Sequence, residues 1–299
     1  MSREAHPALP EFEYVKPKSL AEASQFLAEH AGVSRPLLGG TDTFVRLRDG
    51  AWKENRYLVD VKGLDGTNEL SFDPQEGVTI GAAVCMNQVS SFGPVKEYYA
   101  LLAEACDTVA AYQLRNRATI VGNICNASPA GDTVGACLLL NGVLNVYGVD
   151  GVRQEPLEGF FKGPGKTNLK PGDIVTSLQL PIPPVGMVGT YLKLNRNKSS
   201  DLAIVGVTVI AFPNEANPSK VTVRLALASV APVPLVVDIV EDFFVENALN
   251  PENISAAAQM AMEACTPIDD VRGTARYRNL MVRNLSRQAL EFIMEELPS

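Results

Sequence analysis

The spacing of apolar residues predicts helices in three stretches of the chain. Ser19, a residue type that favours the position just before a helix, opens the segment 19–31, whose apolar residues recur at helical spacing. Alanine and leucine recur three to four residues apart through residues 95–109. Residues 277–297 place apolar side chains on one side and mostly polar ones on the other, which predicts a long amphipathic helix.

Short apolar runs predict strands between and after these helices. Early in the chain the strands alternate with helices, whereas after residue 184 the strands come first and the helices follow, a pattern typical of an α+β domain. The predicted strands are residues 36–38, 57–61, 77–83, 143–147, 174–180, 190–195, 203–212 and 220–230. Shorter helices are predicted at residues 43–48, 242–249 and 253–264.

The run Leu180-Pro181-Ile182-Pro183-Pro184 is the best candidate for a linker between domains. A second change of pattern follows residue 62, where a small α/β unit ends. We therefore predict three parts, residues 1–62, 63–183 and 184–299, the last with an antiparallel sheet and helices.

Composition and charge exclude several functional classes. The net charge is −8, which disfavours binding to nucleic acid or acidic lipid. No apolar stretch approaches the ~20 residues that span a bilayer. The first 13 residues are charged and proline-rich and lack the apolar core of a signal peptide, so we expect a cytoplasmic protein.

The chain also lacks side chains that could carry redox or hydrolytic chemistry alone. Five cysteines without C-x-x-C spacing fit free thiols better than disulfides, and they form no iron–sulfur ligand set. With only His6 and His30 present, neither a zinc site nor a Ser-His-Asp triad is expected. An enzyme of this composition would depend on a bound cofactor.

Two segments contain residues suited to an anionic ligand. Gly39 and Gly40 lie between a predicted strand and a predicted helix, where the backbone can approach phosphate closely, and Thr41 adds a hydroxyl. This segment could equally be an ordinary strand–turn–helix connection. The second segment, residues 119–133, is a loop rich in Gly, Asn and Ser, and Asp132 in it could accept hydrogen bonds from ribose hydroxyls. For this loop we favour a ligand over a purely structural role.

Known nucleotide motifs are absent from both segments. Neither contains G-x-G-x-x-G after a strand. Residues 163–167 end in Gly-Lys-Thr, but Phe160 occupies the place of the first glycine of a phosphate loop, so we predict a turn there.

Taken together, the two segments resemble the FAD-binding subunit of molybdenum hydroxylases, a family that includes xanthine dehydrogenase and carbon monoxide dehydrogenase. The matching residues are Leu-Leu-Gly-Gly-Thr-Asp at 37–42, Arg-Asn-Arg-Ala-Thr-Ile-Val-Gly-Asn-Ile at 115–124, and Ala-Ser-Pro-Ala-Gly-Asp at 127–132. Residues 160–167 look like part of the bacterial xanthine dehydrogenase FAD subunit, and residues 267–278 look like the family's C-terminal signature. The resemblance covers nearly the whole chain.

The resemblance implies a fold and a set of cofactor contacts. The fold would be a two-part FAD-binding domain of the vanillyl-alcohol-oxidase type, followed by an α+β C-terminal domain. The first segment would wrap the FAD pyrophosphate, the second would continue around it to the ribose at Asp132, and Ile174 or Val175 would touch the adenine side. The implied FAD-binding residues are Arg35, Pro36, Leu37, Leu38, Gly39, Gly40, Thr41, Asp42, Thr43, Thr119, Ile120, Gly122, Asn123, Ile124, Ser128, Asp132, Ile174, Val175 and Lys193.

Lys193 has the one catalytic role that the resemblance implies. It matches a lysine near the flavin ring, where a cation would stabilise the negative charge of the reduced flavin. Without the resemblance, we would interpret Lys193 as a surface residue. The sequence departs from the family pattern at Val121, where glycine is usual, and at Val236, where an arginine often follows Pro234.

The function implied is electron relay within a complex. A molybdopterin-binding large subunit would hydroxylate the substrate, and a [2Fe–2S] small subunit would pass electrons to FAD on this chain, then to NAD⁺ or another acceptor. Residues 160–167 favour a purine or other N-heterocycle as substrate over carbon monoxide or an aldehyde. The alternative from another class is a scaffold of this fold without flavin.

Overall fold

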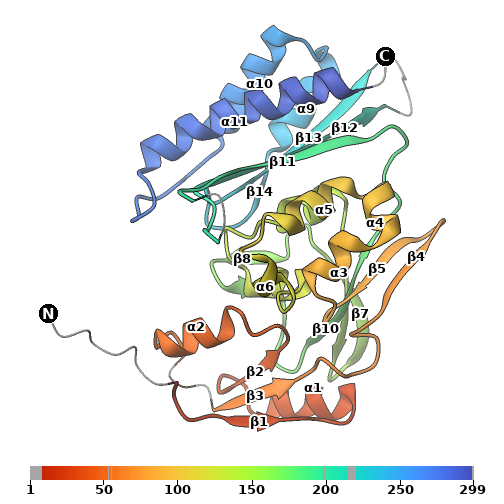
Figure 1. Cartoon of the computed structure of the whole chain (residues 1–299), viewed down its shortest axis with the longest axis vertical. Helices are drawn as coiled ribbons and strands as arrows, with labels where there is room; N and C mark the ends of the chain where they lie inside the picture. Colours follow the sequence, from red (N-terminus) through yellow and green to blue (C-terminus); the bar gives the residue numbers. More distant parts are fainter. Residues whose placement is uncertain (1–8, 53, 55, 198–199, 215–219, 298–299) are drawn as a thin grey trace, which may run out of the picture.

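The computed structural model describes residues 9–52, 54, 56–197, 200–214 and 220–297. The three larger β-sheets follow one another along the long axis of the molecule, in the order in which they occur in the sequence (Figure 1). Each sheet lies inside one of the three predicted parts. Within the described residues, no helix is both long and apolar enough to cross a membrane.

The first part is a three-stranded parallel sheet with two helices. Its strand order is β1-β3-β2. The elements are β1 (Glu13–Val15), α1 (Leu20–Glu29), β2 (Ser34–Leu37), α2 (Thr43–Arg48) and β3 (Tyr57–Asp60). Ser19 caps α1 as predicted, because its side chain accepts a hydrogen bond from the Glu22 amide. Ala23 and Leu27 of α1 then pack into a small core with β3.

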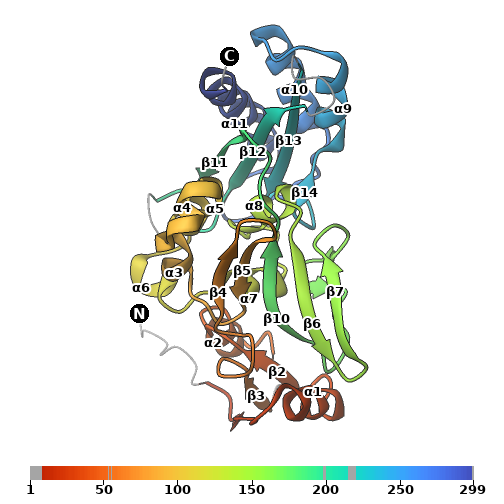
Figure 2. The same ribbon diagram turned by 90° about the vertical axis from the view of Figure 1, so that its right-hand side faces the viewer.

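The second part is a five-stranded antiparallel sheet with helices on one face (Figure 2). The strand order is β4-β5-β10-β6-β7, and a separate hairpin joins β8 to β9. The strands are β4 (Leu70–Asp73), β5 (Gly77–Gly81), β6 (Val143–Gly148), β7 (Gly151–Pro156), β8 (Phe161–Gly163), β9 (Lys166–Thr167) and β10 (Ile174–Leu180). The helices are α3 (Met86–Ser91), α4 (Gly93–Tyr98), α5 (Ala100–Asp107), α6 (Tyr112–Arg115), α7 (Ile120–Asn126) and α8 (Val134–Leu139).

The C-terminal part is a four-stranded antiparallel sheet between two helical layers. Helices α9, α10 and α11 form the layer on one face of the sheet. Helices α5 and α8 of the second part pack against the other face. The elements are β11 (Val188–Leu194), β12 (Val205–Pro213), β13 (Val221–Ala228), β14 (Leu235–Val236), α9 (Asp238–Glu246), α10 (Pro251–Glu263) and α11 (Ala275–Glu296). The sheet thus joins its own core to that of the second part.

The predicted fold class is confirmed, but some local predictions were wrong. The helix predicted at 95–109 is two helices, α4 and α5, broken at Tyr99, whose hydroxyl donates to the carbonyls of Leu180 and Pro181. The predicted loop 119–133 begins with a helix, α7. Several further elements were not predicted, among them β1, β4, β7, β14, α3, α6 and α8, and none of these is longer than six residues.

The contact between α8 and β12 generates a test of how the two parts pack. A Cβ at Gly135 would overlap the Thr208 hydroxyl. We expect overpacking in Gly135→Ala to destabilise the protein by about 1–3 kcal/mol. The higher helix propensity of alanine should offset up to ~1 kcal/mol of this loss. Chemical denaturation measures this loss. Thr208→Ala in the same chain should recover much of it, whereas strictly additive losses would contradict the contact.

Candidate cofactor site

The glycine loop after β2 packs directly against the segment before α7. Gly40 has φ +75°, a conformation that glycine adopts without strain. A Cβ at Gly39 would overlap the carbonyl oxygen of Arg117. The first glycine therefore permits close approach of two backbones, and the second permits the turn. The structure brings the two predicted segments together, although they lie about eighty residues apart in the sequence.

Side chains fasten these two segments to each other. The Asn126 amide donates to the Asp42 carboxylate at 2.9 Å. Thr119 caps α7 by accepting from the Gly122 amide, which leaves the Thr119 hydroxyl proton free to donate elsewhere. Asn123 accepts from Thr133 and so ties α7 to the start of α8. Asp42 therefore orients the loop through this hydrogen bond.

The β8–β9 hairpin is a third wall of this region, and it was not predicted as a site element. The Gly165 amide donates to the carbonyl of Ala127 at the end of α7. The Arg46 guanidinium of α2 lies 3.7 Å from where a Gly165 Cβ would stand. Residues 163–167 form the predicted turn. This turn lies against both the end of α7 and Arg46 of α2.

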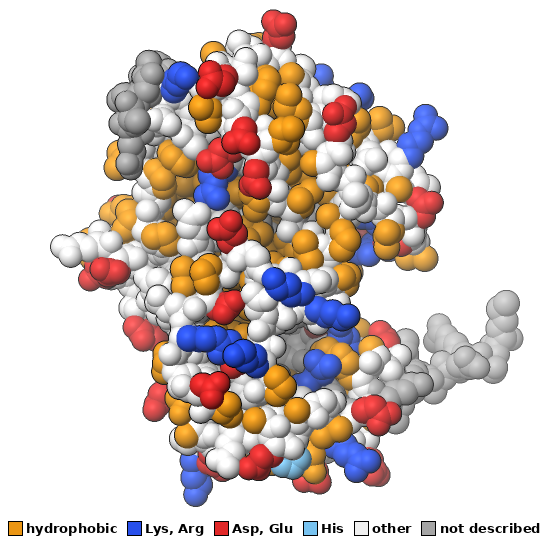
Figure 3. Space-filling view, turned by 180° about the vertical axis from the view of Figure 1, so that it is seen from behind, with side chains coloured by type: hydrophobic (Ala, Val, Ile, Leu, Met, Phe, Trp, Pro, Cys, Tyr) orange, Lys and Arg blue, Asp and Glu red, His pale blue; other side chains and the backbone are white. Residues whose placement is uncertain are grey.

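Cations gather near the glycine loop. The guanidinium of Arg35 stacks on Trp52 at 3.9 Å from the ring centre, and that of Arg46 approaches the same ring at 5.3 Å. Burial and the nearby Arg46 lower the pKa of Arg35. Figure 3 shows Lys and Arg side chains around a hollow in the lower half of the molecule. Positive charge beside glycine loops suits a phosphate-containing ligand.

Lys193, which the sequence alone suggested as a surface residue, is buried in an ion pair. Its Nζ lies 2.9 Å from Asp132 Oδ2, and each of the two side chains is only 6% exposed. The Tyr191 hydroxyl donates to Asp132 Oδ1 at 2.6 Å, and Lys193 also donates to the Thr108 carbonyl. Gly206, opposite Lys193 on β12, leaves room for the Tyr191 ring. The pair joins the C-terminal sheet to the second part.

Burial and the neighbouring charges shift the pKa values of Asp132 and Tyr191 in this network. Burial raises the pKa of Asp132, while Lys193 and Tyr191 oppose that rise. Burial and the Asp132 carboxylate raise the pKa of Tyr191 well above its ordinary value, so its hydroxyl keeps its proton and acts as the donor. Because both oxygens of Asp132 have partners within the chain, the geometry favours an ion-pair role for Asp132. Its ribose contact stays a prediction.

A cavity of about 520 Å³ opens beside Lys193. Its wall is the segment between α5 and α6, in which three successive carbonyl groups each accept a hydrogen bond. Lys193 binds the carbonyl of Thr108, Arg115 binds that of Val109, and the Ser200 amide binds that of Ala110. Ala110 has φ +46°, a strained conformation for a residue with a side chain and one that concentrates at functional sites. Two of the three Lys193 N–H groups are used, which leaves one for a ligand.

The remaining predicted residues divide by burial. The side chains of Leu37, Ile120, Ile124, Ile174 and Val175 are buried in the cores, so any contact they make with a cofactor depends on their backbone or on rearrangement. Half-buried or exposed residues remain accessible around the glycine loop and α7: Arg35, Pro36, Leu38, Thr41, Asp42, Thr43, Asn123 and Ser128. Val121, at the position where glycine is usual, is buried in the core.

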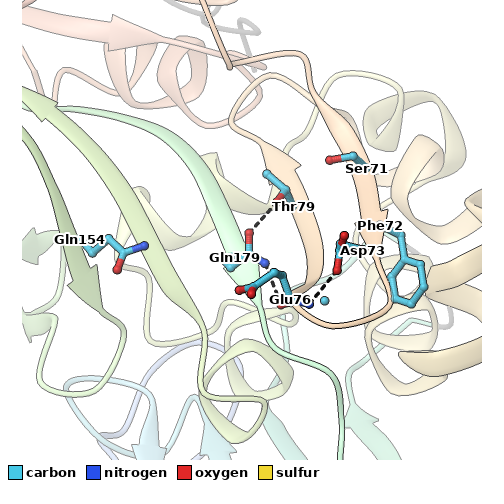
Figure 4. A pocket seen from close by; sticks show the side chains of 8 residues that line it. Ser71, Phe72, Asp73, Glu76, Thr79, Gln154 and Gln179 are labelled. Atoms are coloured by element: carbon cyan, nitrogen blue, oxygen red, sulfur yellow. Dashed lines mark hydrogen bonds between the residues drawn. The ribbon is translucent and has the colours of Figure 1, made fainter.

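A second cavity, also about 520 Å³, lies on the outer face of the five-stranded sheet (Figure 4). None of the predicted cofactor residues lines it. Two of its polar side chains are paired within the lining, because Thr79 donates to Gln179 and Gln179 donates to the Glu76 carbonyl. This cavity has the character of a solvated sheet face.

Comparison with known proteins identifies the family. Residues 10–183 match the model of the FAD binding domain in molybdopterin dehydrogenase, and residues 190–293 match that of the CO dehydrogenase flavoprotein C-terminal domain. The chain belongs to the FAD-binding subunits of molybdenum hydroxylases. FAD is therefore its cofactor, and the glycine loop, with no space for a side chain at Gly39, fits that group.

Individual relatives cover almost the whole length of this flavoprotein subunit. It is 31% identical to the carbon monoxide dehydrogenase medium chain of Hydrogenophaga pseudoflava, over 94% of this chain and 96% of that protein. It is 25% identical to the xanthine dehydrogenase FAD-binding subunit of Escherichia coli O157:H7, over 93% and 94%. The structure of the Hydrogenophaga pseudoflava enzyme lacking the Mo-pyranopterin moiety of its cofactor matches with a TM-score of 0.91 at 28% identity, covering 97% of this chain and 100% of that one.

The contact between Gly39 and Arg117 generates a prediction for FAD binding. A Cβ there forces the glycine loop and the segment before α7 apart, so we expect Gly39→Ala to weaken FAD binding at least tenfold, or roughly 1.4 kcal/mol. Fluorescence titration of the deflavinated protein measures the dissociation constant. Gly93→Ala is the matched control, because Gly93 also lacks a positive φ and has open space around it. Equal FAD affinity in both variants would refute the assignment.

The buried ion pair generates a prediction for stability. Lys193→Met leaves Asp132 buried without its cation and should cost about 3–5 kcal/mol. Because protonated Asp132 needs no cation, and its folded pKa would rise further in the variant, the loss should be smallest at low pH and grow as the pH rises. Asp132→Asn added to Lys193→Met should restore most of the stability. Denaturation curves between acid and neutral pH measure both, and a loss independent of pH would argue against the pair.

Proposed function

We propose that this chain receives electrons singly from a [2Fe–2S] partner subunit and passes them through FAD to NAD⁺ or another acceptor. A molybdopterin-binding partner subunit hydroxylates the substrate, a purine or other N-heterocycle. Bound FAD supplies the redox chemistry, since it accepts electrons one at a time and donates them in pairs. The observation that carries the proposal is the cavity beside Lys193, which lies where the FAD-binding part meets the C-terminal sheet.

Different residues of the chain bind the cofactor and adjust its reduction potential. Gly39, Gly40 and Thr41 with the residues from Thr119 to Ile124 hold the pyrophosphate, and the Arg35–Arg46 pair adds positive charge beside it. Lys193, the proposed catalytic residue, faces the flavin with its remaining N–H and stabilises the negative charge that reduction brings. Asp132 neutralises Lys193 and so limits this effect.

Two features bear on the substrate. Residues 160–167 resemble the xanthine dehydrogenase FAD subunit, and their hairpin contacts α7. The second candidate is carbon monoxide or an aldehyde, favoured by the 31% identity to the carbon monoxide dehydrogenase medium chain. Anaerobic flavin bleaching in the co-expressed complex decides between them. Bleaching by hypoxanthine or nicotinate supports the proposal, whereas bleaching only by carbon monoxide or an aldehyde supports the second candidate.

The balance of charge beside the cavity generates a prediction for the flavin potential. Asp132→Asn leaves the Lys193 cation without its counter-charge, so the reduced, anionic flavin should become more stable by ~1–2 kcal/mol, the scale of a charged hydrogen bond. The two-electron potential should then rise by roughly 20–45 mV. Adding Lys193→Met to Asp132→Asn should bring it back or lower it. Reductive titration of flavin-loaded proteins measures this, and identical potentials would return Lys193 to a purely structural role.

A further inference from the structure

Lys193 belongs to a row of three paired residues across the C-terminal sheet. It pairs with Gly206 of β12, and Gly206 pairs with Ala228 of β13. Because β11 is an edge strand, β12 is its only partner among the described strands of this sheet. The place of the Lys193 side chain beside the cavity therefore depends on how β12 and β13 are held at this row.

Arg278 of α11 binds the two strand ends next to this row. Ile204 directly precedes β12, Ser229 directly follows β13, and Arg278 Nη1 donates to the carbonyls of both, at 2.6 and 3.0 Å. Nη2 of the same guanidinium donates to the Asp270 carboxylate at 2.7 Å. Because the guanidinium is planar and rigid, these three hydrogen bonds fix the spacing of the two strand ends.

Arg278 is a buried cation with one unsatisfied nitrogen. It is 2% exposed, and its Nε is buried without a hydrogen-bond partner. A buried ion pair adds little net stability over apolar side chains of similar volume, whereas its directional hydrogen bonds specify one arrangement. The contacts with Asp270 and with the two carbonyls therefore indicate a residue that sets the position of its neighbours.

Ser229 extends this arrangement to the segment that carries Asp132. The Ser229 amide donates at 2.7 Å to the carbonyl of Pro129, three residues before Asp132. The Ser229 hydroxyl donates to the Ala203 carbonyl at 2.9 Å. Ser229 has φ +68°, a strained conformation for a residue with a side chain, and persists in it because its amide, hydroxyl and carbonyl are all held. Both members of the buried ion pair are thus positioned through one point.

We propose that Arg278 is a positioning residue for the pair of Lys193 and Asp132, and through this pair for reduction of the flavin. The inference rests on the proposed function, in which Lys193 stabilises the reduced flavin. Arg278 acts on the row of Lys193 through Ile204, and on the segment of Asp132 through Ser229. A shift of either carbonyl moves one charge of the pair relative to the other and to the flavin, and so alters the interaction of Lys193 with the reduced cofactor.

The reduction potential of the bound flavin tests this role. Arg278→Lys keeps the buried cation but replaces the planar fork by a single nitrogen, which cannot hold both carbonyls and Asp270 in the same geometry. FAD content should be retained, while the two-electron potential should fall toward that of Lys193→Met. Leu290→Ala is the matched control, because Leu290 is fully buried in the C-terminal core about 18 Å further along the same helix.

A fall of the potential in Arg278→Lys alone supports the proposal. Loss of FAD from Arg278→Lys, an unchanged potential, or equal shifts in Arg278→Lys and Leu290→Ala overturn it. Asp132→Asn, measured alongside, separates this inference from the proposed function. An unchanged potential in Asp132→Asn refutes the proposed role of Lys193 itself. A shift in Asp132→Asn with none in Arg278→Lys refutes only the positioning role.

Chemical denaturation of the deflavinated protein gives a readout that does not involve the flavin. Lys193→Met breaks the ion pair, so it should destabilise an Arg278→Lys chain, in which the pair is already misplaced, less than it destabilises the wild type. The two residues share no hydrogen-bond partner among the described residues, so independent effects would be additive, and additive losses overturn the proposal. If the buried lysine prevents folding, Ser229→Ala, which removes only the hydroxyl bonded to Ala203, takes its place in both measurements with the same outcomes.

Discussion

The structure depends on one buried ion pair, formed by Lys193 of β11 and Asp132 of the segment between α7 and α8. Either charge alone would be costly at this depth, so each side chain requires the other. Tyr191 accounts for the second carboxylate oxygen, and Thr108 for a second lysine hydrogen. One polar cluster thereby connects the two cores and fixes the wall of the cavity beside Lys193.

A second constraint acts at the other end of the site, where backbone meets backbone. Gly39 and the Arg117 carbonyl approach so closely that no side chain fits between them. The hydrogen bond from Asn126 to Asp42 closes the same junction from the side. The site thus combines an ion pair beside the cavity with a close backbone contact at the glycine loop, and each can be altered without the other.

The sequence predicted the fold class and the two segments of the site, because these follow from local patterns. Ser19 capped its helix, and Gly39-Gly40 lay at a strand–helix turn, as their residue types indicate. Helix α7 was missed because Gly122 and two asparagines lower the helix propensity of a seven-residue segment. The pairing of Lys193 with Asp132 was also missed. Each residue was assigned to a ligand separately, and nothing local relates two positions 61 residues apart.

That separation has a consequence for the order of events during synthesis. Asp132 leaves the ribosome 61 residues before Lys193, a delay of roughly 3–12 s at about 5–20 residues per second. Until β11 emerges, the nascent second part has a carboxylate without its cation and a helix, α8, without the sheet it packs on. The second part therefore completes its folding only after the residues of β11 have been synthesised. A ribosome that stalls before residue 193 releases a polypeptide with an exposed apolar surface, a substrate for chaperones and proteases.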